Sequence, residues 1–259
     1  MVKIVSWNIN SIRIRINLLK HLIDKIKPDI ILLQEIKCSN DDFPDFYTEL
    51  DYKLIVNGQK GKYGVASLIK KGFSTQTIEL SKSIFQKESR TNFFYLDELD
   101  LTVLNVYTPN GNPLENNEKF AFKINWLNEI KKVSEEYINE MRNLLIAGDF
   151  NVIENKKDAT KFEGWENDAL GHIDTRQKFR EIISSGLQNV ARVFYEPGQK
   201  FSYWDYQRAS WERNDGLLID HFLISPKFLS SVKSINFEST YRGMEKPSDH
   251  IPVWIELNI

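Results

Sequence analysis

Carboxylate and amide side chains follow one short apolar run after another along this chain, at the point where each run ends. A plain turn would more often place Gly or Pro there. The polar residues at these positions are Asn8, Asn10, Glu35, Tyr107, Asn110, Asp149, Asn151, Asp220, Asp249 and His250. A carboxylate at the edge of an apolar core is costly unless it is paired or bound to a cation. Because ligands of α/β sheets gather at strand ends, the pattern predicts a cation-binding catalytic cleft.

The types of side chain in this set indicate which cation the cleft would take. Oxygen donors dominate, and the whole chain has one cysteine and four histidines. Hard divalent cations prefer oxygen ligands, whereas zinc favours thiolates and imidazoles. We therefore expect Mg²⁺, with Mn²⁺ as a substitute, rather than zinc.

Each of these residues has a simpler explanation when it is taken alone. Asp149 in GDFN would be an ordinary turn residue that hydrogen-bonds its own backbone. Glu35 would cap a helix or pair on the surface, and His250 would be an ordinary hydrogen-bonded histidine. The functional interpretation therefore depends on the ordered set and not on any one member.

The composition is that of an ordinary soluble protein. Hydrophobic residues make up 41% and charged residues 27% of the 259 residues, which is enough apolar material for a sizeable core. The formal net charge of -2 gives no support to a nucleic-acid partner. A DNA-binding surface would therefore have to be a local basic patch.

Three features predict a cytoplasmic protein. Cys38 is the only cysteine, which excludes an internal disulfide and fits a reducing compartment. The N-terminal string MVKIVSWNIN lacks the charged and long apolar segments of a signal peptide. No apolar run approaches the ~20 residues that span a bilayer. We expect a monomer without membrane contact, because nothing indicates an oligomerisation helix.

Short runs rich in β-forming residues alternate with segments of helical period. The expected strands are KIVSW, DIILL, GVASLI, NFFYL, LTVLNVY, NLLIAG, LLIDHFLI and PVWIEL. Helices are expected over Ile12–Ile26, Asn117–Ile138 and Thr175–Ser185. The weakly patterned polar segment Ile153–Gly171 is interpreted as a surface loop. Since no linker interrupts the alternation, we expect a single mixed α/β domain over residues 1–259.

Seven strings along the chain appear in the order and near the spacing of a known family: WNIN, LQEIK, GQKGKYGVA, NVYTPNG, GDFN, GLLIDHFLIS and EKPSDHIPVW. From Lys3 to Leu257 the chain resembles the exonuclease III/AP endonuclease branch of the endonuclease–exonuclease–phosphatase superfamily. The resemblance implies a four-layer α/β sandwich, in which two mixed β-sheets pack face to face with helices on the outer faces. It also implies a magnesium-dependent hydrolase that cuts double-stranded DNA 5′ to abasic sites and removes 3′ nucleotides or 3′-blocking groups.

The resemblance further implies a metal-binding group and a positioned water. Glu35, assisted by Asn8, would hold the metal, and Asp149 would orient or deprotonate the attacking water. Asn151 would steady that water and the scissile phosphate, and Asp249 would help to place a metal or polarise the neighbouring imidazole. The predicted metal-binding candidates are Asn8, Glu35, Asp149, Asn151, Asp249 and His250.

Charge on the phosphate would be met by hydrogen-bond donors. Tyr107 and Asn110 would hydrogen-bond phosphate oxygens, and His250, held by Asp220, would donate to a non-bridging oxygen. A carboxylate beside an imidazole raises the histidine pKa and keeps the ring charged near neutral pH. The predicted catalytic residues are Tyr107, Asp149, Asn151, Asp220 and His250.

A glycine-rich segment and an aromatic segment favour DNA over a small phosphate ester. GQKGKYG places Lys60, Lys62 and Tyr63 on a flexible loop that could approach a phosphodiester strand, although a cationic hairpin turn explains it equally well. Seven aromatic residues lie between Phe194 and Trp211. They suit base stacking, and core packing accounts for about half of them.

The resemblance places three of these residues around an abasic sugar. Tyr203, Trp204 and Leu217 fall where the family lines a pocket that admits a baseless sugar and excludes an intact nucleotide. The predicted DNA-binding residues are Asn10, Lys60, Lys62, Tyr63, Asn110, Tyr203, Trp204 and Leu217.

Other functions stay open on the sequence alone. Ile153–Gly171 is shorter than the corresponding segment of some relatives; it carries Trp165 and is followed directly by His172. The alternative is therefore a 3′-5′ exonuclease or 3′-phosphatase with little abasic-site activity. A phosphatase for a small or lipid-linked ester and a catalytically inactive DNA-binding module are further alternatives. Lys37 would either tune the metal site or face solvent.

Overall fold

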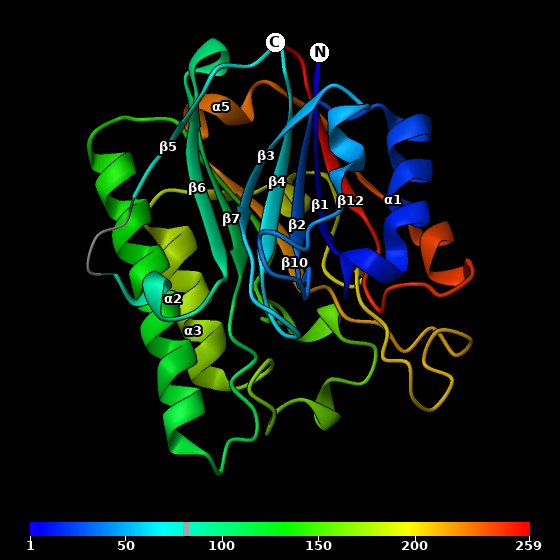
Figure 1. Cartoon of the computed structure of the whole chain (residues 1–259). Helices are drawn as coiled ribbons and strands as arrows, with labels where there is room; N and C mark the ends of the chain where they lie inside the picture. Colours follow the sequence, from blue (N-terminus) through cyan, green and yellow to red (C-terminus); the bar gives the residue numbers. More distant parts are fainter. Residues whose placement is uncertain (80–82) are drawn as a thin grey trace.

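Two six-stranded sheets lie face to face in the computed structural model, which describes residues 1–79 and 83–259 (Figure 1). The first sheet contains β1 (Val2–Asn8), β2 (Ile30–Gln34), β3 (Tyr52–Asn57), β4 (Val65–Lys70), β11 (Val232–Phe237) and β12 (Val253–Leu257). The second contains β5 (Thr75–Thr77), β6 (Thr91–Leu96), β7 (Leu101–Tyr107), β8 (Leu144–Asp149), β9 (Gln188–Asn189) and β10 (Asp220–Ile224). Their strand orders are β11-β12-β1-β2-β4-β3 and β5-β6-β7-β8-β10-β9.

Helices cover the two outer faces, so the predicted four-layer sandwich is confirmed (Figure 1). The helix α1 (Ile12–Ile26) lies against the first sheet, whereas α2 (Asn117–Asn139) and α3 (Ile173–Ser184) lie against the second. The shorter helices are α4 (Val190–Phe194) and α5 (Pro226–Leu229). In the described residues, no helix combines the length and apolarity needed to cross a membrane.

The alternation of side chains along each central strand builds the layers. On β1, Ile4 belongs to the apolar layer between the sheets, while Val5 and Trp7 pack toward α1. On β8, Leu145 lies between the sheets and Ile146 packs toward α2 and α3. Strands that are buried on both faces read as continuous apolar runs, which explains why the sequence shows runs here instead of a polar alternation.

Strand direction brings the polar ends of these runs to one end of the sandwich. The strand β1 runs parallel to β2, and β7 runs parallel to β8. Because β10 is antiparallel to β8 and β12 is antiparallel to β1, their first residues lie at the end where β1 and β8 finish. The chain termini lie at the opposite end (Figure 1), where the amino group of Met1 donates to the carbonyl of Ile259 over 3.0 Å.

The prediction that Ile153–Gly171 is a surface loop was wrong in part. The segment forms two short 3-10 helices, Lys156–Asp158 and Phe162–Gly164. Apolar side chains of the segment pack with Leu217 and Ile219 in a separate apolar cluster beneath it. The polar composition of the segment gave no indication of these buried residues, because they become buried only when distant parts of the chain meet.

Predicted boundaries agree with the structure for the helix Ile12–Ile26 and for the strand Leu101–Tyr107. The strand LLIDHFLI begins later than expected, at Asp220, because Leu217 forms isolated bridges to Ala159 and Tyr203 instead of continuing the sheet.

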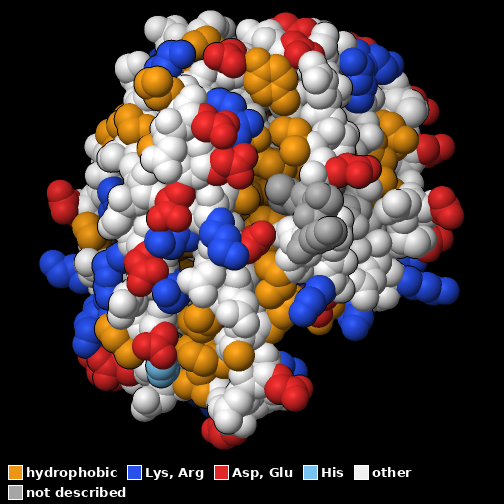
Figure 2. Space-filling view, turned by 90° about the vertical axis from the view of Figure 1, so that its left-hand side faces the viewer, with side chains coloured by type: hydrophobic (Ala, Val, Ile, Leu, Met, Phe, Trp, Pro, Cys, Tyr) orange, Lys and Arg blue, Asp and Glu red, His pale blue; other side chains and the backbone are white. Residues whose placement is uncertain are grey.

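Figure 2 shows the side of the molecule on which α2 and α3 lie in Figure 1. Lys and Arg side chains are interspersed there with Asp and Glu side chains. Among the side chains drawn in colour on this face, no basic patch stands out.

Candidate active site

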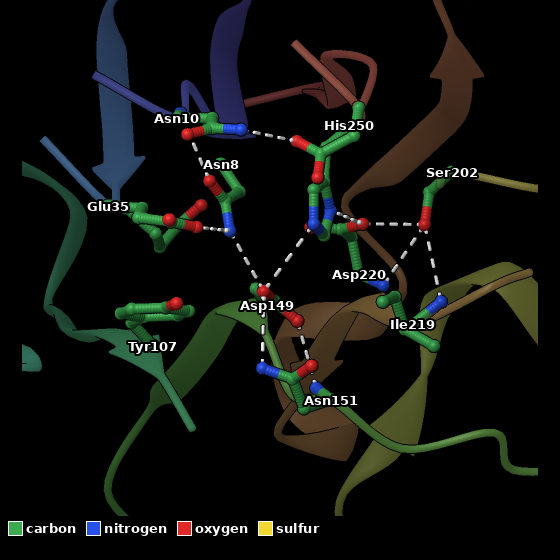
Figure 3. Close-up of polar contacts among 12 residues, drawn as sticks. Asn8, Asn10, Glu35, Tyr107, Asp149, Asn151, Ser202, Ile219, Asp220 and His250 are labelled. Carbon is green, nitrogen blue, oxygen red and sulfur yellow. Dashed lines mark hydrogen bonds and ion pairs between the residues drawn. The ribbon is translucent and has the colours of Figure 1, made fainter. Parts of the chain in front are cut away.

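Three titratable side chains meet where the strand ends converge. Asp149 is the last residue of β8, and Asp220, the first residue of β10, is its partner in the antiparallel register. His250 comes from the segment that precedes β12 of the other sheet (Figure 3). The group Asp149, Asp220 and His250 is referred to below as the buried triad, because its members are only 1%, 2% and 4% exposed.

The imidazole of the buried triad lies between the two carboxylates. His250 Nδ1 donates to Asp220 Oδ2 over 2.8 Å, and His250 Nε2 lies 3.7 Å from Asp149 Oδ2. Burial alone would lower the pKa of His250, but the charges of Asp220 and Asp149 outweigh it and raise that pKa to about 10. Burial raises the pKa of Asp149 to about 7, although the charge of His250 opposes the shift. The ring is therefore charged at neutral pH, and Asp149 can exchange a proton in that range.

A serine that sequence reasoning missed orients the triad from behind. Ser202 Oγ donates to Asp220 Oδ2 over 2.6 Å and accepts from the backbone N–H groups of Ile219 and Asp220 (Figure 3). Ser202 is completely buried. These bonds hold the carboxylate of Asp220 toward His250 in one orientation.

An amide joins the triad to a more open part of the site. Asn8 Nδ2 donates to Asp149 Oδ2 over 2.9 Å and to Glu35 Oε2 over 3.1 Å. Lys37 Nζ lies 2.8 Å from Glu35 Oε1, and the two side chains are 32% and 18% exposed. Glu35 and Lys37 are referred to below as the open pair. Of the two possibilities for Lys37, contact with the predicted metal-binding group is the one observed.

The amide of Asn151 is fixed by the backbone around it. Asn151 N donates to Asp149 Oδ1 over 2.9 Å, and Asn151 Nδ2 donates to the carbonyl of Thr108 over 2.9 Å. The Oδ1 atom accepts a 3.5 Å hydrogen bond from Asn110 Nδ2. Asn151 has a φ of 49°, a left-handed conformation that asparagine tolerates better than most residues.

These side chains surround one cavity of about 320 Å³. Its walls contain most of the predicted catalytic and metal-binding residues, and Asp220 lies behind His250 outside the lining. The predicted residues among those that line it are Asn8, Glu35, Tyr107, Asn110, Asp149, Asn151, Tyr203, Asp249 and His250. Burial raises the pKa of Tyr107 well above its ordinary value, and the charges of Glu35 and Asp149 act in the same direction, so its hydroxyl stays a neutral donor.

The tyrosine of the predicted basic loop contacts Tyr107, which lines the cavity. The rings of Tyr63 and Tyr107 contact each other edge to face, with centroids 6.4 Å apart. Arg90, which the sequence did not single out, places its guanidinium 3.8 Å from the centroid of Tyr63 and 4.7 Å from that of Tyr107. Lys60 and Lys62 are exposed. The loop therefore supports Tyr107 and presents two cations to solvent.

Asn10 links Asp249 to the open pair. Its Nδ2 donates to Asp249 Oδ1 over 3.0 Å, and its Oδ1 accepts from Lys37 Nζ over 2.6 Å. The residues of the predicted sugar pocket do not all lie at the cavity. Tyr203 contacts His250 edge to face with centroids 4.9 Å apart, and it lines the cavity.

Trp204 is a correction to the predicted sugar pocket. It is 3% exposed, contacts Trp211 edge to face and donates its Nε1 to Asn214 Oδ1 over 3.2 Å. It therefore packs in the interior and lines neither the active-site cavity nor the cavity next to it. Leu217 lines a second cavity of about 470 Å³, which shares Trp165, Tyr203 and Asp205 with the first.

A family model with the description Endonuclease/Exonuclease/phosphatase family matches residues 5–250 of this chain. The chain belongs to this family. The match extends from Val5 in β1 to His250, so it includes the second sheet, every strand of the first sheet except β12, and every member of the buried triad and the open pair.

Relatives within the endonuclease/exonuclease/phosphatase family resemble the chain over its full length. Exodeoxyribonuclease III of Haemophilus influenzae is 33% identical over 270 residues, which cover 98% of this chain and 99% of the relative. Among solved structures, an AP endonuclease from Archaeoglobus fulgidus has a TM-score of 0.92 at 26% identity, with full coverage of both chains. A 3′ phosphatase from Neisseria, bound to a product DNA hairpin, has a TM-score of 0.89 at 28% identity, also with full coverage.

A buried lysine was also missed by sequence reasoning. Lys123 lies on α2 and has no exposed surface. A usable signal was present, since Lys123 falls on the same helical stripe as the apolar residues Trp126, Leu127 and Ile130, where a charged residue is unusual.

Proposed function

We propose that this chain is a magnesium-dependent DNA-repair phosphodiesterase that cuts the backbone 5′ to abasic sites and removes 3′ nucleotides or 3′-blocking groups. The observation that carries the proposal is the convergence of the buried triad and the open pair on one cavity, joined by Asn8. Membership of the family and similarity to an exodeoxyribonuclease III support the choice of DNA as substrate.

Asp149 is the proposed group that orients and deprotonates the attacking water. Its carboxylate accepts from Asn8 Nδ2 and from Asn151 N, which leaves further lone pairs for a water. Because burial raises its pKa to about 7, the ionised form is basic enough to accept a proton near neutral pH.

His250 is the proposed donor to a non-bridging phosphate oxygen. Asp220 holds the protonated ring by its Nδ1 and leaves the Nε2 proton facing the cavity. A fixed cation in a buried site stabilises developing negative charge more strongly than a solvated one does. Tyr107 and Asn110 would donate to other oxygens of the same phosphate.

The donor set fits a hard divalent cation. Glu35 and Asn8 would hold it, with Asp149, Asn151 and Asp249 as further oxygen donors around the same cavity. The ligand atoms of the buried triad also lie within 4.8 Å of one another, close enough to hold a metal ion. We assign a proton to His250 in preference to a metal, since Asp220 accepts from its Nδ1 and Asp149 lies 3.7 Å from its Nε2. When bound, the ion would neutralise charge on the phosphate and acidify water.

Incision of a defined duplex tests the proposal. A 5′-labelled duplex with one tetrahydrofuran abasic analogue is incubated with the protein in Mg²⁺ and in EDTA, with Asp149→Asn as the control. We expect a single cut 5′ to the lesion in Mg²⁺ and none in EDTA or with the variant. Absence of both metal-dependent incision and 3′-end processing would refute the proposed function.

The second candidate is a 3′-5′ exonuclease or 3′-phosphatase with little abasic-site activity. The similarity to the Neisseria 3′ phosphatase, with its TM-score of 0.89, favours it. Rates on an abasic duplex, a recessed 3′ hydroxyl and a 3′ phosphate, measured side by side, distinguish the two candidates. A rate on the abasic duplex far below the other two would select the second.

A further inference from the structure

A buried lysine joins three segments at one side of the cavity. Lys123 Nζ donates to the carbonyl oxygens of Asn110, Asn151 and Ala169 over 2.9, 2.6 and 2.9 Å. Burial lowers the pKa of Lys123 to about 7, and the three carbonyls match the three N–H donors of its protonated form. Asn110 follows β7, Asn151 follows β8, and Ala169 lies in the segment before α3, so the contacts connect three separate loops.

The three loops meet closely around the lysine side chain. At Gly111, whose φ is 87°, an added Cβ would lie 2.7 Å from Lys123 Cδ and 3.2 Å from the Cβ of Ala169. Asn112 Oδ1 accepts from Ala169 N over 3.0 Å, which ties the first loop to the third. The loop after β7 therefore passes directly over the lysine stem.

Core packing alone does not explain a lysine here. Lys123 lies on the buried stripe of α2, where an apolar residue would fill the same volume without removing a charge from water. Its three partners are neutral carbonyls, which stabilise a buried ammonium less well than a carboxylate would. The contacts are, however, well placed to act on the site, since Asn110 and Asn151 both line the cavity.

We propose that Lys123 is a positioning residue, which sets the separation between the amides of Asn110 and Asn151 and thereby the phosphate-binding side of the cavity. The inference rests on the proposed function. Asn110 Nδ2 lies 3.5 Å from Asn151 Oδ1, so both amides face the same space. Without the ammonium, the three carbonyls lose their common donor and the loops separate.

Hydrogen exchange tests the structural half of this proposal without any activity. Lys123→Met keeps the length of the side chain and removes its donors. Val133→Ala, at a buried position further along the same helix, is the control for a general loss of stability. We expect faster amide exchange in residues 109–112, 150–153 and 168–171 of Lys123→Met, and unchanged relative protection there in Val133→Ala. Equal protection of these loops in the two variants would overturn the proposal.

Single-turnover cleavage tests the functional half. Misplacement of reacting groups by about 1 Å can slow a reaction about 100-fold, so we expect a loss of about that size in Lys123→Met at saturating DNA. Val133→Ala should stay near the wild-type rate. Lys123→Gln keeps an NH₂ donor, so its rate should lie between those of wild type and Lys123→Met. If Lys123→Met does not fold, Lys123→Gln takes its place in both experiments.

A double-mutant cycle with Asn110→Ala separates positioning from a general structural effect. If Lys123 acts through Asn110, the loss caused by Lys123→Met shrinks in the Asn110→Ala background. Fully additive losses would overturn the proposal. If the wild-type protein does not cut DNA, the proposed function fails, while the exchange experiment still decides whether Lys123 holds the loops.

Discussion

The buried triad and the open pair share one amide, Asn8, and differ in nearly every other physical respect. The side chains of the triad are at most 5% exposed, whereas those of Glu35 and Lys37 are 18% and 32% exposed. Charges interact strongly when they are removed from water, but a partly exposed ion pair is screened and weak. The difference indicates a fixed half that stabilises charge and an exchangeable half in which a cation can replace the ammonium of Lys37.

The largest expected effect comes from neutralising the fixed half. Asp149→Asn preserves the size of the side chain and removes its ability to accept a proton. We expect single-turnover incision to fall by about 10³-fold or more, whereas DNA affinity, measured by fluorescence anisotropy in EDTA, stays near that of wild type. A rate within tenfold of wild type would remove Asp149 from the mechanism.

Asp220→Asn should have the next largest effect and also move the pH profile. In the wild type, incision should rise as pH increases through about 7, where Asp149 loses its proton, and fall through about 10, where His250 loses its proton. The charge of Asp220 raises both pKa values. Its removal should therefore shift both limbs to lower pH and slow the reaction by roughly 100-fold.

The pH dependence of single-turnover incision from pH 5 to 11 checks this prediction. Ser202→Ala is a useful comparison, because it removes a hydrogen bond to Asp220 and keeps the charge. Its limbs should stay close to those of wild type. If the alkaline limb of Asp220→Asn coincides with that of wild type, Asp220 does not control the protonation of His250.

The sequence predicted the parts of this site that are encoded locally. An apolar run followed by a polar residue marks both a strand and its end, and the strand Leu101–Tyr107 agrees with the structure to the residue. The ordered motifs then placed these ends on a two-sheet fold, which the structure confirms. The same information predicted that Glu35, Asp149 and His250 meet at one site, and in the structure all three line one cavity.

Features that depend on contacts between distant segments could not be predicted in this way. Trp204 shares a segment with Tyr203, yet it packs against Trp211 and away from the cavity. The burial of Ile153–Gly171 requires Leu217 and Ile219 from another part of the chain. Lys123 likewise acquires its partners only when three loops meet. Residue type and local spacing do not predict such contacts directly.

A smaller effect is expected from the exchangeable half. Lys37→Met removes the ammonium that lies 2.8 Å from Glu35, so a divalent cation no longer competes with it. We expect the Mg²⁺ concentration for half-maximal incision to fall by up to about fivefold, which corresponds to the free energy of about 1 kcal/mol that a partly exposed ion pair contributes at most. A titration of the single-turnover rate with Mg²⁺ measures this concentration.

The ion pair of Lys70 with Asp29 offers a matched control. Its atoms are also 2.8 Å apart, and the side chains are 38% and 17% exposed, close to the values of the open pair. Lys70→Met should leave the Mg²⁺ requirement unchanged. If Lys37→Met raises the requirement instead of lowering it, Lys37 assists the metal site and does not compete for it.

The smallest expected effect concerns the exposed cations of the basic loop, which would contact phosphates outside the cavity. Lys60→Ala should weaken binding to all DNA sequences alike and reduce the slope of log affinity against log salt by about 1, because one fewer counterion is released. The rate at saturating DNA should not change, since Lys60 is exposed and does not line the cavity. Lys233→Ala is the control, because Lys233 lies beside Met1 at the opposite end of the sandwich. An unchanged salt slope for Lys60→Ala would exclude Lys60 from the DNA footprint.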